Sequence, residues 1–151
     1  MRFFSAEEVH SALSLPALAD AIAQAFRAGT TAPLRHAHAL SATDSLLLMP
    51  AWNAAQGGAI GVKLVTVLPN NRARDFSTVN ALYVLFDRES GEPRAVIDGE
   101  ALTLRRTAAA SLLAARYLAR RDARNVLIVG TGRLARFMLG PIAPAATSSG
   151  S

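Results

Sequence analysis

The sequence predicts a mixed α/β protein, and three observations lead to this expectation. Apolar residues at helical spacing fill the first 30 residues, and closely spaced apolar strands follow between residues 46 and 97. A long helix then leads into an apolar strand and a glycine turn near residue 130. Strands so close in sequence favour an antiparallel or mixed sheet with the early helices packed on it, so we expect an α+β domain followed by the start of a second domain.

The first 30 residues are predicted to form two helices. Residues 5–8, with the sequence SAEE, show the capping-box pattern that satisfies free backbone N–H groups at a helix start. Pro16 suits the first turn of a second helix, and Gly29 can end that helix. The polar stretch around His36 and His38 is predicted to be a loop or an edge strand.

Four apolar stretches in the middle of the chain are predicted to be strands. The first is expected to stop at Pro50, because proline has no N–H to donate to a strand ladder. An exposed loop is expected at 72–77, and a turn at 87–93. The predicted strands are residues 46–49, 60–68, 79–86 and 94–97.

The last third of the chain is predicted to cross a domain boundary near Asp122. A helix is expected to begin at Thr103, a suitable N-cap residue, and to run to about Arg121. The continuous apolar run at 125–129 is typical of a strand in a parallel sheet. We therefore expect a first domain at 1–121, the start of a second domain at 122–140 and a disordered tail at 141–151.

The spacing Gly130-x-Gly132-x-x-Ala135 predicts the first turn of a dinucleotide-binding unit. The first glycine permits a tight turn, the second allows backbone to approach a pyrophosphate, and the small third residue lets helix pack on strand. We expect Gly130, Thr131, Gly132 and Ala135 to contact NAD or NADP, at the start of a Rossmann domain. A plain glycine-rich turn is the alternative, because the confirming acidic residue would come ~20 positions later, where the chain ends.

The composition argues against several classes of protein. The formal charge is +5, but the basic residues are scattered and no nucleic-acid-binding motif is present, so we expect no nucleic acid partner. No apolar run approaches the ~20 residues of a membrane helix. The chain has no cysteine, and His36 and His38 lack a third ligand at a suitable spacing, so no metal site is predicted. We expect a soluble, cytoplasmic protein.

Lys63 is the candidate for chemistry within the strands. It is the single lysine among 16 basic residues, and an ammonium, unlike a guanidinium, can release its proton near neutral pH. A lysine facing a closed sheet interior would lie in a site, whereas one that points to water or is present by chance would have no role. Arg105, Arg106 and Thr107 are predicted to lie in the first turn of a helix and to bind a carboxylate or phosphate there, with a solvated first turn as the alternative.

Taken together, these segments resemble the ornithine cyclodeaminase/μ-crystallin family. The resemblance runs in order from about Met1 to Leu139, and the Arg-Thr-Ala-Ala segment at 106–109 is its most specific part. The matching stretches are LLMPAW at 47–52, GVKLVT at 61–66, GEP at 91–93, DG at 98–99, RTAAAS at 106–111 and IVGTG at 128–132.

The resemblance implies a domain organisation and a set of residue roles. It implies an N-terminal domain for substrate binding and dimerisation, a following Rossmann domain for NAD or NADP, and a homodimer. In the family, the residues matching Arg35, Lys63 and Arg106 hold the substrate carboxylate. Those matching Thr78, Arg106 and Thr107 approach the cofactor.

The Met-Pro-Ala-Trp context at 49–52 resembles the Δ1-pyrroline-2-carboxylate reductases of the family. It implies NAD(P)H-dependent reduction of a cyclic imino acid, with Lys63 as a catalytic residue that polarises or protonates the imine nitrogen. Two alternatives remain open. One is an ornithine cyclodeaminase, which forms L-proline and ammonia from L-ornithine, and the other is a non-catalytic dimerising or remnant domain.

The chain also departs from the family pattern. Ser77 stands where the family commonly has proline before the residue matching Thr78. The resemblance stops at about Gly140, before most of the Rossmann sheet and the catalytic aspartate of the cyclodeaminases. We therefore expect a truncated family member, through a frameshift, a premature stop or fragmentation, that is inactive by itself.

Overall fold

The computed structural model describes residues 1–53 and 58–138, so the tail expected at 141–151 lies outside the described residues. The described strands form one mixed sheet of seven strands in the order β1-β7-β6-β5-β4-β2, with β3 also paired to β4. The pairing of β1 with β7 is parallel, and the other pairings are antiparallel. The mixed sheet expected from the sequence is therefore confirmed. The strands are β1 (Arg2–Phe4), β2 (Thr30–Thr31), β3 (His36–Ala39), β4 (Ser45–Asn53), β5 (Ala59–Val67), β6 (Val79–Asp87) and β7 (Pro93–Asp98).

The two early helices form as their sequence signals predict. Helix α1 (Ala6–Ala12) begins with a capping box, in which Ser5 Oγ accepts from the Glu8 N–H at 3.3 Å and the Glu8 carboxylate accepts from the Ser5 N–H at 2.8 Å. Helix α2 (Leu15–Ala28) has Pro16 in its first turn. It ends at Gly29, whose positive φ of 77° is a conformation that glycine adopts without strain.

Two predictions about breaks in the sheet region are wrong. Strand β4 does not stop at Pro50 but continues through it to Asn53. Strand β3 pairs with β4 up to Leu48 and β2 pairs from Trp52, so Pro50 lies on a stretch of that edge with no partner strand, where a missing N–H is tolerated. The segment expected as a loop at 72–77 begins instead inside a 3-10 helix, η1 (Pro69–Arg74).

The long helix α3 (Gly99–Leu118) begins five residues earlier than predicted. Its N-cap is Asp98, whose carboxylate accepts from the Ala101 N–H at 2.7 Å, so the prediction of Thr103 as N-cap is wrong. An aspartate caps as well as a threonine does, and here it follows β7 directly, which leaves no loop between strand and helix. The helix end was predicted at about Arg121, three residues beyond the observed end.

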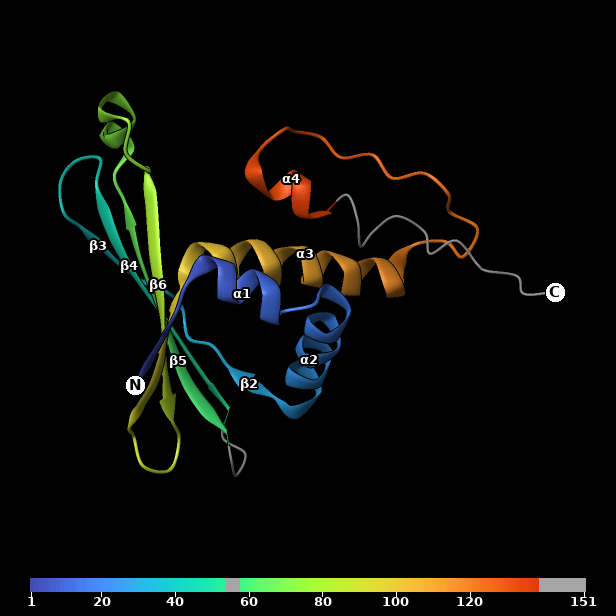
Figure 1. Cartoon of the computed structure of the whole chain (residues 1–151), viewed down its shortest axis with the longest axis horizontal. Helices are drawn as coiled ribbons and strands as arrows, with labels where there is room; N and C mark the ends of the chain where they lie inside the picture. The colour runs from blue at the N-terminus through green and yellow to red at the C-terminus, as the bar shows by residue number, and fades with distance from the viewer. Residues whose placement is uncertain (54–57, 139–151) are drawn as a thin grey trace.

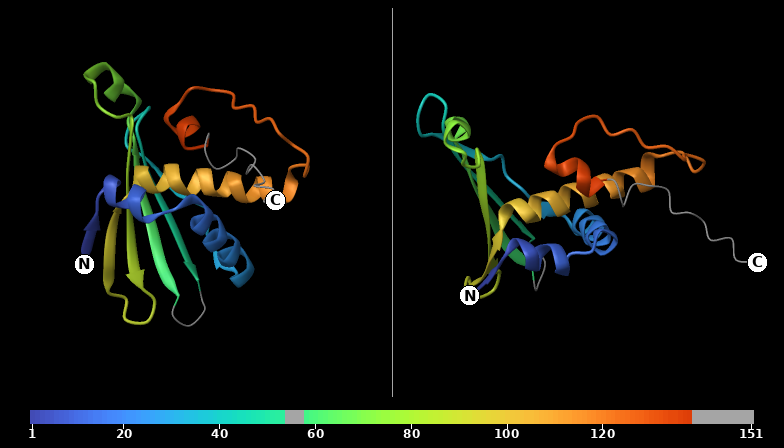
Figure 2. Two further views of the ribbon diagram at one scale, coloured as in Figure 1. Left: turned by 45° about the vertical axis from the view of Figure 1, so that its right-hand side comes forward. Right: turned by 45° about the horizontal axis from the view of Figure 1, so that its top comes forward.

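The described helices lie on one side of the sheet (Figures 1 and 2). Helix α3 contacts β6 and β7 near its start and then projects away from the sheet, with α1 and α2 packed along it. Ala19 of α2 is buried against Ala109 and Leu113 of α3, so small side chains permit this close helix packing. Among the described residues, none of the helices has the length and apolar character that crossing a membrane requires.

The other side of the sheet carries no helix from the described part of the chain, as all three views show. Alternate residues of a strand point to opposite faces, so the register places one set of side chains on this side, which we name the open face. Its members are largely apolar. They are Leu46, Leu48, Trp52, Ile60, Val62, Leu64, Leu82, Val84, Phe86 and Val96.

The strand predicted at 125–129 does not form in the described structure. Residues 123–130 have no regular secondary structure, and Leu127 and Val129 are 88% and 90% exposed. A strand needs a neighbour for its N–H and C=O groups, and this segment has none beside it. The helix expected after the glycine turn is present as α4 (Arg133–Met138).

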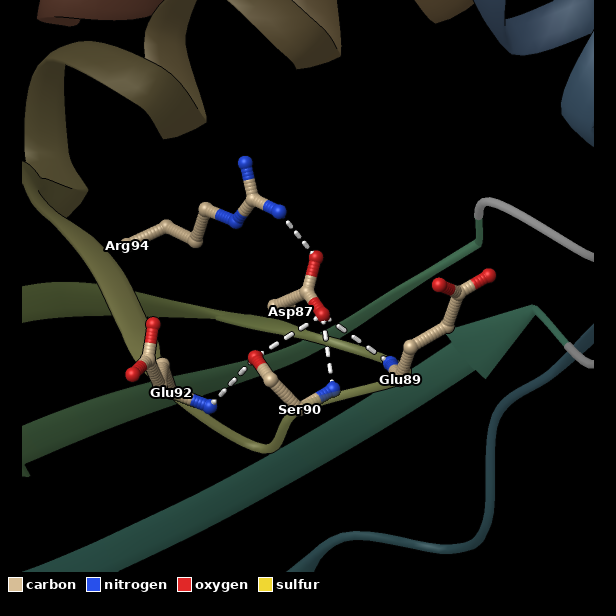
Figure 3. Close-up of polar contacts among 5 residues, drawn as sticks. All are labelled: Asp87, Glu89, Ser90, Glu92 and Arg94. Atoms are coloured by element: carbon tan, nitrogen blue, oxygen red, sulfur yellow. Dashed lines mark hydrogen bonds and ion pairs between the residues drawn. The ribbon is translucent and has the colours of Figure 1, made fainter.

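The turn between β6 and β7 is held by one carboxylate (Figure 3). Asp87 Oδ1 accepts from the backbone N–H of Glu89 at 3.0 Å and from both the N–H and the hydroxyl of Ser90, at 2.8 and 3.0 Å. Arg94 forms an ion pair with the other oxygen. The hydrogen bonds from Ser90, with Arg94, lower the pKa of Asp87 to about 2.

Candidate functional site

The site begins with Lys63, at the centre of β5. Its register partners are Met49 on β4 and Tyr83 on β6, so these three side chains share the face of the sheet that α3 covers. Lys63 Nζ donates a hydrogen bond to Thr103 Oγ1 of α3 at 2.6 Å. The side chain therefore points into the space between sheet and helix. This is the orientation in which Lys63 was expected from the sequence to lie in a site.

Arg106 supplies the second positive charge of the site. It lies on α3 three residues after Thr103, and positions three apart share one side of a helix. Burial lowers the pKa of Lys63, and the neighbouring Arg106 guanidinium lowers it further, so the two cations are close enough to interact. One of these two neighbouring cations is half-buried and the other is exposed, and cations of this kind can bind a carboxylate.

The prediction that Arg105, Arg106 and Thr107 lie in the first turn of a helix is wrong. Because α3 begins at Gly99, these residues lie in its second and third turns. The free N–H groups and positive potential of a helix start are confined to the first turn, so they do not contribute at Arg106. Arg105 instead donates to the backbone carbonyl of His10, which ties α3 to α1. The helix start therefore adds nothing to the positive charge of Arg106 and Lys63.

Tyr83 packs against Gly61 beside Lys63. A Cβ added to Gly61 would lie 1.7 Å from the Tyr83 hydroxyl oxygen and 2.4 Å from Cζ, so the ring occupies the place of a side chain at position 61. Burial raises the pKa of Tyr83, so the phenol is neutral at pH 7. Tyr83 thereby forms a neutral wall next to the two cations. Tyr83 was not selected from the sequence, because a tyrosine within an apolar strand usually indicates only a packing residue.

Thr78 is not brought to Lys63 by the described structure, whereas Arg35 comes directly before His36, which pairs with Leu48 next to Met49, the register partner of Lys63. Arg35 is exposed between β2 and β3, and the described residues include no ion-pair partner for it. Thr78 precedes β6, five positions from Tyr83, which corresponds to roughly 17 Å along an extended strand. Its carbonyl accepts from the Leu68 N–H at 2.8 Å, so its position is fixed by the loop at that end of β5 and β6. Thr107 is half-buried beside Arg106 on α3.

The glycine turn lies near the start of α3. Gly130 has a positive φ of 114°, and a Cβ at Gly130 or Gly132 would meet nothing within 4 Å, so the turn is open to an approaching group. The Ala135 N–H donates to Gly132 O at 3.0 Å and closes the first turn of α4. Arg133 forms an ion pair with Glu100, which brings the turn to the N-terminal end of α3. The turn residues thus fit a pyrophosphate, whereas the strand that should precede them is unpaired.

A cavity of about 360 Å³ lies next to the site but does not include Lys63 among its lining residues. Two of its lining residues are the acids Asp98 and Glu100. Carboxylates repel a second carboxylate, so this cavity is a poorer place for an acidic substrate than the space between Lys63 and Arg106. Among residues 1–53 and 58–138, no cluster of histidines and acids suits a metal ion.

Comparison with known proteins identifies the family of the chain. The model of the ornithine cyclodeaminase/mu-crystallin family matches residues 2–145. A Δ1-pyrroline-2-carboxylate reductase from Colwellia psychrerythraea is 34% identical over 145 residues, covering 92% of this chain and 45% of the relative. The chain therefore belongs to the ornithine cyclodeaminase/μ-crystallin family.

Solved structures of this family superpose on the fold. An archaeal alanine dehydrogenase dimer with bound NAD matches with a TM-score of 0.82 at 33% identity, over 93% of this chain and 44% of that one. The Δ1-pyrroline-2-carboxylate reductase of Thermococcus litoralis, solved with NADH and L-proline, matches with a TM-score of 0.82 at 28% identity, over 94% and 45%. The chain thus spans less than half the length of these relatives.

Proposed function

We propose that this chain forms the substrate-binding part of an enzyme that transfers hydride from NADH or NADPH to the C=N carbon of a cyclic imino acid such as Δ1-pyrroline-2-carboxylate. The observation that carries the proposal is the hydrogen bond that turns Lys63 towards α3, where Arg106 follows Thr103 by three residues and lies close enough to lower the pKa of Lys63. A cyclic imino acid offers the matching chemistry, because it bears a carboxylate next to a basic imine nitrogen.

Lys63 and Arg106 would bind different parts of the substrate. The Arg106 guanidinium can hold the carboxylate through two hydrogen bonds, while the Lys63 ammonium neutralises its charge and faces the imine nitrogen. The lowered pKa of Lys63 makes its proton easier to donate to that nitrogen. Arg35 would join the carboxylate from the segment between β2 and β3, as the family resemblance implies.

A nicotinamide cofactor would supply the hydride. Gly130, Thr131, Gly132 and Ala135 would hold its pyrophosphate, since the open backbone at both glycines leaves room for phosphate oxygens. Thr78, Arg106 and Thr107 would lie towards its reactive end, as the family resemblance implies. The choice between NAD and NADP depends on residues that follow the glycine turn.

A chimaera tests the proposal directly. Residues 1–138 of this chain are joined to the remainder of the Colwellia reductase, and turnover of Δ1-pyrroline-2-carboxylate and of L-ornithine is measured with both cofactors. We expect imine reduction that is lost in the Arg106→Gln variant. Arg94→Gln, at an exposed arginine of strand β7, is the matched control. Ornithine turnover without imine reduction would replace this proposal with a cyclodeaminase.

We also propose that two copies of the chain pair through the open face. Soluble proteins rarely leave an apolar patch of this extent in water, and self-association is the usual way to cover it. Val84→Arg, on the central strand β6, should shift the protein to monomer in sedimentation velocity. Ala114→Arg adds the same side chain to an exposed position of α3 and should leave the association unchanged. A dimer that persists in Val84→Arg would contradict this assignment.

A further inference from the structure

We propose that Thr103 is a positioning residue that holds the Lys63 amine in place for the substrate, and that Gly99 sets the distance between that threonine and the strand. This inference rests on the function proposed above for Lys63. Thr103 was expected to cap the helix, and the structure assigns it a different partner.

The hydrogen bonds of Thr103 give its hydroxyl a defined direction. The hydroxyl donates its proton to the Gly99 carbonyl at 2.5 Å, which leaves its lone pairs free. One of these accepts from Lys63 Nζ at 2.6 Å. A threonine hydroxyl has a single proton, and Thr103 already donates it to Gly99. Thr103 can therefore only accept a hydrogen bond from Lys63. The contact therefore orients the lysine and leaves its remaining N–H groups for a ligand.

Gly99 explains why the threonine reaches the lysine. A Cβ at position 99 would lie 2.7 Å from the backbone carbonyl carbon of Ala81 and 2.7 Å from its Cβ, so α3 begins in direct contact with β6. Thr103 follows one helical turn later on the same side of α3. Ala81 pairs with Val65 of β5, and Lys63, which pairs with Tyr83, lies two residues from Val65 along the same strand. A larger residue at position 99 would move the helix away from the sheet and lengthen the Lys63–Thr103 contact.

The site benefits from this contact because Lys63 would otherwise be free to move. A lysine side chain has four rotatable bonds, and the adjacent Arg106 repels it from the position where both cations meet one carboxylate. The Thr103 acceptor offsets that repulsion locally. The amine is thus held near the carboxylate position before the substrate arrives, which is the preorganisation that efficient catalysis needs.

The single lysine makes a direct test possible. In the 151-residue chain labelled with ¹³C-lysine, all side-chain signals come from Lys63, and its two Hε protons resonate separately when the side chain is fixed. We expect separate Hε resonances in the wild type and in Thr103→Ser, which keeps the hydroxyl. Thr103→Val should merge them, whereas Thr31→Val on the exposed strand β2 should not. Merged resonances in the wild type, or separate ones with unchanged shifts in Thr103→Val, would overturn the inference.

Two additions keep the outcomes distinct. Should Thr103→Val fail to fold, Thr103→Ala removes the same acceptor with a smaller side chain and is read in the same way. Titration of the labelled wild type with L-proline tests the proposed function separately: unchanged Lys63 shifts would count against substrate binding at this site, while the Thr103 comparison would still stand. In the chimaera, Thr103→Val should lower kcat/KM for the imine by ~10-fold or more, with recovery in Thr103→Ser.

Discussion

Replacement of Gly61 by alanine tests the packing that surrounds Lys63. The new Cβ would lie 1.7 Å from the Tyr83 hydroxyl oxygen, 2.4 Å from Cζ and 3.0 Å from Cε1, all well inside the ~3.5–4.0 Å of an ordinary contact. The ring must therefore leave its position. Overpacking of this kind destabilises a protein by ~1–3 kcal/mol, and removal of a glycine from a strand returns ~0.5–1 kcal/mol. Since the overlap is large, we expect a net loss of about 1–2 kcal/mol, which corresponds to a fall in Tm of roughly 2–8 °C.

A double-mutant cycle with Tyr83→Leu isolates the cause. Leucine lacks the outer atoms of the ring, so Gly61→Ala in this background should be neutral or stabilising by up to ~1 kcal/mol. The free energy of unfolding of the four proteins is measured in urea at pH 7. A coupling energy of about 2 kcal/mol is expected between the two positions. Equal effects of Gly61→Ala in both backgrounds would refute the reasoning, because the destabilisation would then not come from the tyrosine ring.

Three further predictions address charge and cofactor. The pKa of Asp87 is lowered from 3.8 to about 2, so its contribution to stability is complete above pH 3.8 and is lost as the pH falls through about 2. Asp87→Asn should therefore be less stable than wild type at pH 7, and the free energies of unfolding of the two proteins in urea should converge near pH 2. A difference that stays constant with pH would contradict this. In the chimaera, Lys63→Arg should lower kcat/KM by ~10² or more, because a guanidinium is bulkier and keeps its proton, and near-normal kinetics would leave Lys63 as a mere positive charge. The 151 residues alone should bind NAD and NADPH no more tightly than millimolar in calorimetric titration, since they offer a glycine turn without a paired strand, and micromolar binding would disprove this.

Local signals in the sequence predicted most of the elements. The capping box at Ser5, Pro16 and Gly29 act within a few residues of themselves, so the first two helices could be placed from sequence. Alternation and turn residues likewise located β5, β6 and β7 to within two residues of their bounds. The oddity of one lysine among arginines singled out Lys63, which the structure turns towards α3.

The errors arose where a neighbour distant in sequence decides the local structure. Pro50 reads as a strand end, but it is tolerated because β3 and β2 leave that part of the β4 edge unpaired. The apolar run at 125–129 reads as a strand, yet a strand requires partners for its backbone groups and the described chain provides none there.

The sequence by itself predicted the two early helices, the mixed sheet and the family, and it singled out Lys63. The tertiary structure alone decided that Thr103 binds the lysine, that Gly99 lets the start of α3 lie against β6, and that Tyr83 fills the space over Gly61. Each of these contacts joins residues 20 to 40 positions apart, or depends on the absence of a single Cβ. No periodicity or local propensity encodes such contacts, because they arise only when helix and sheet approach each other in space.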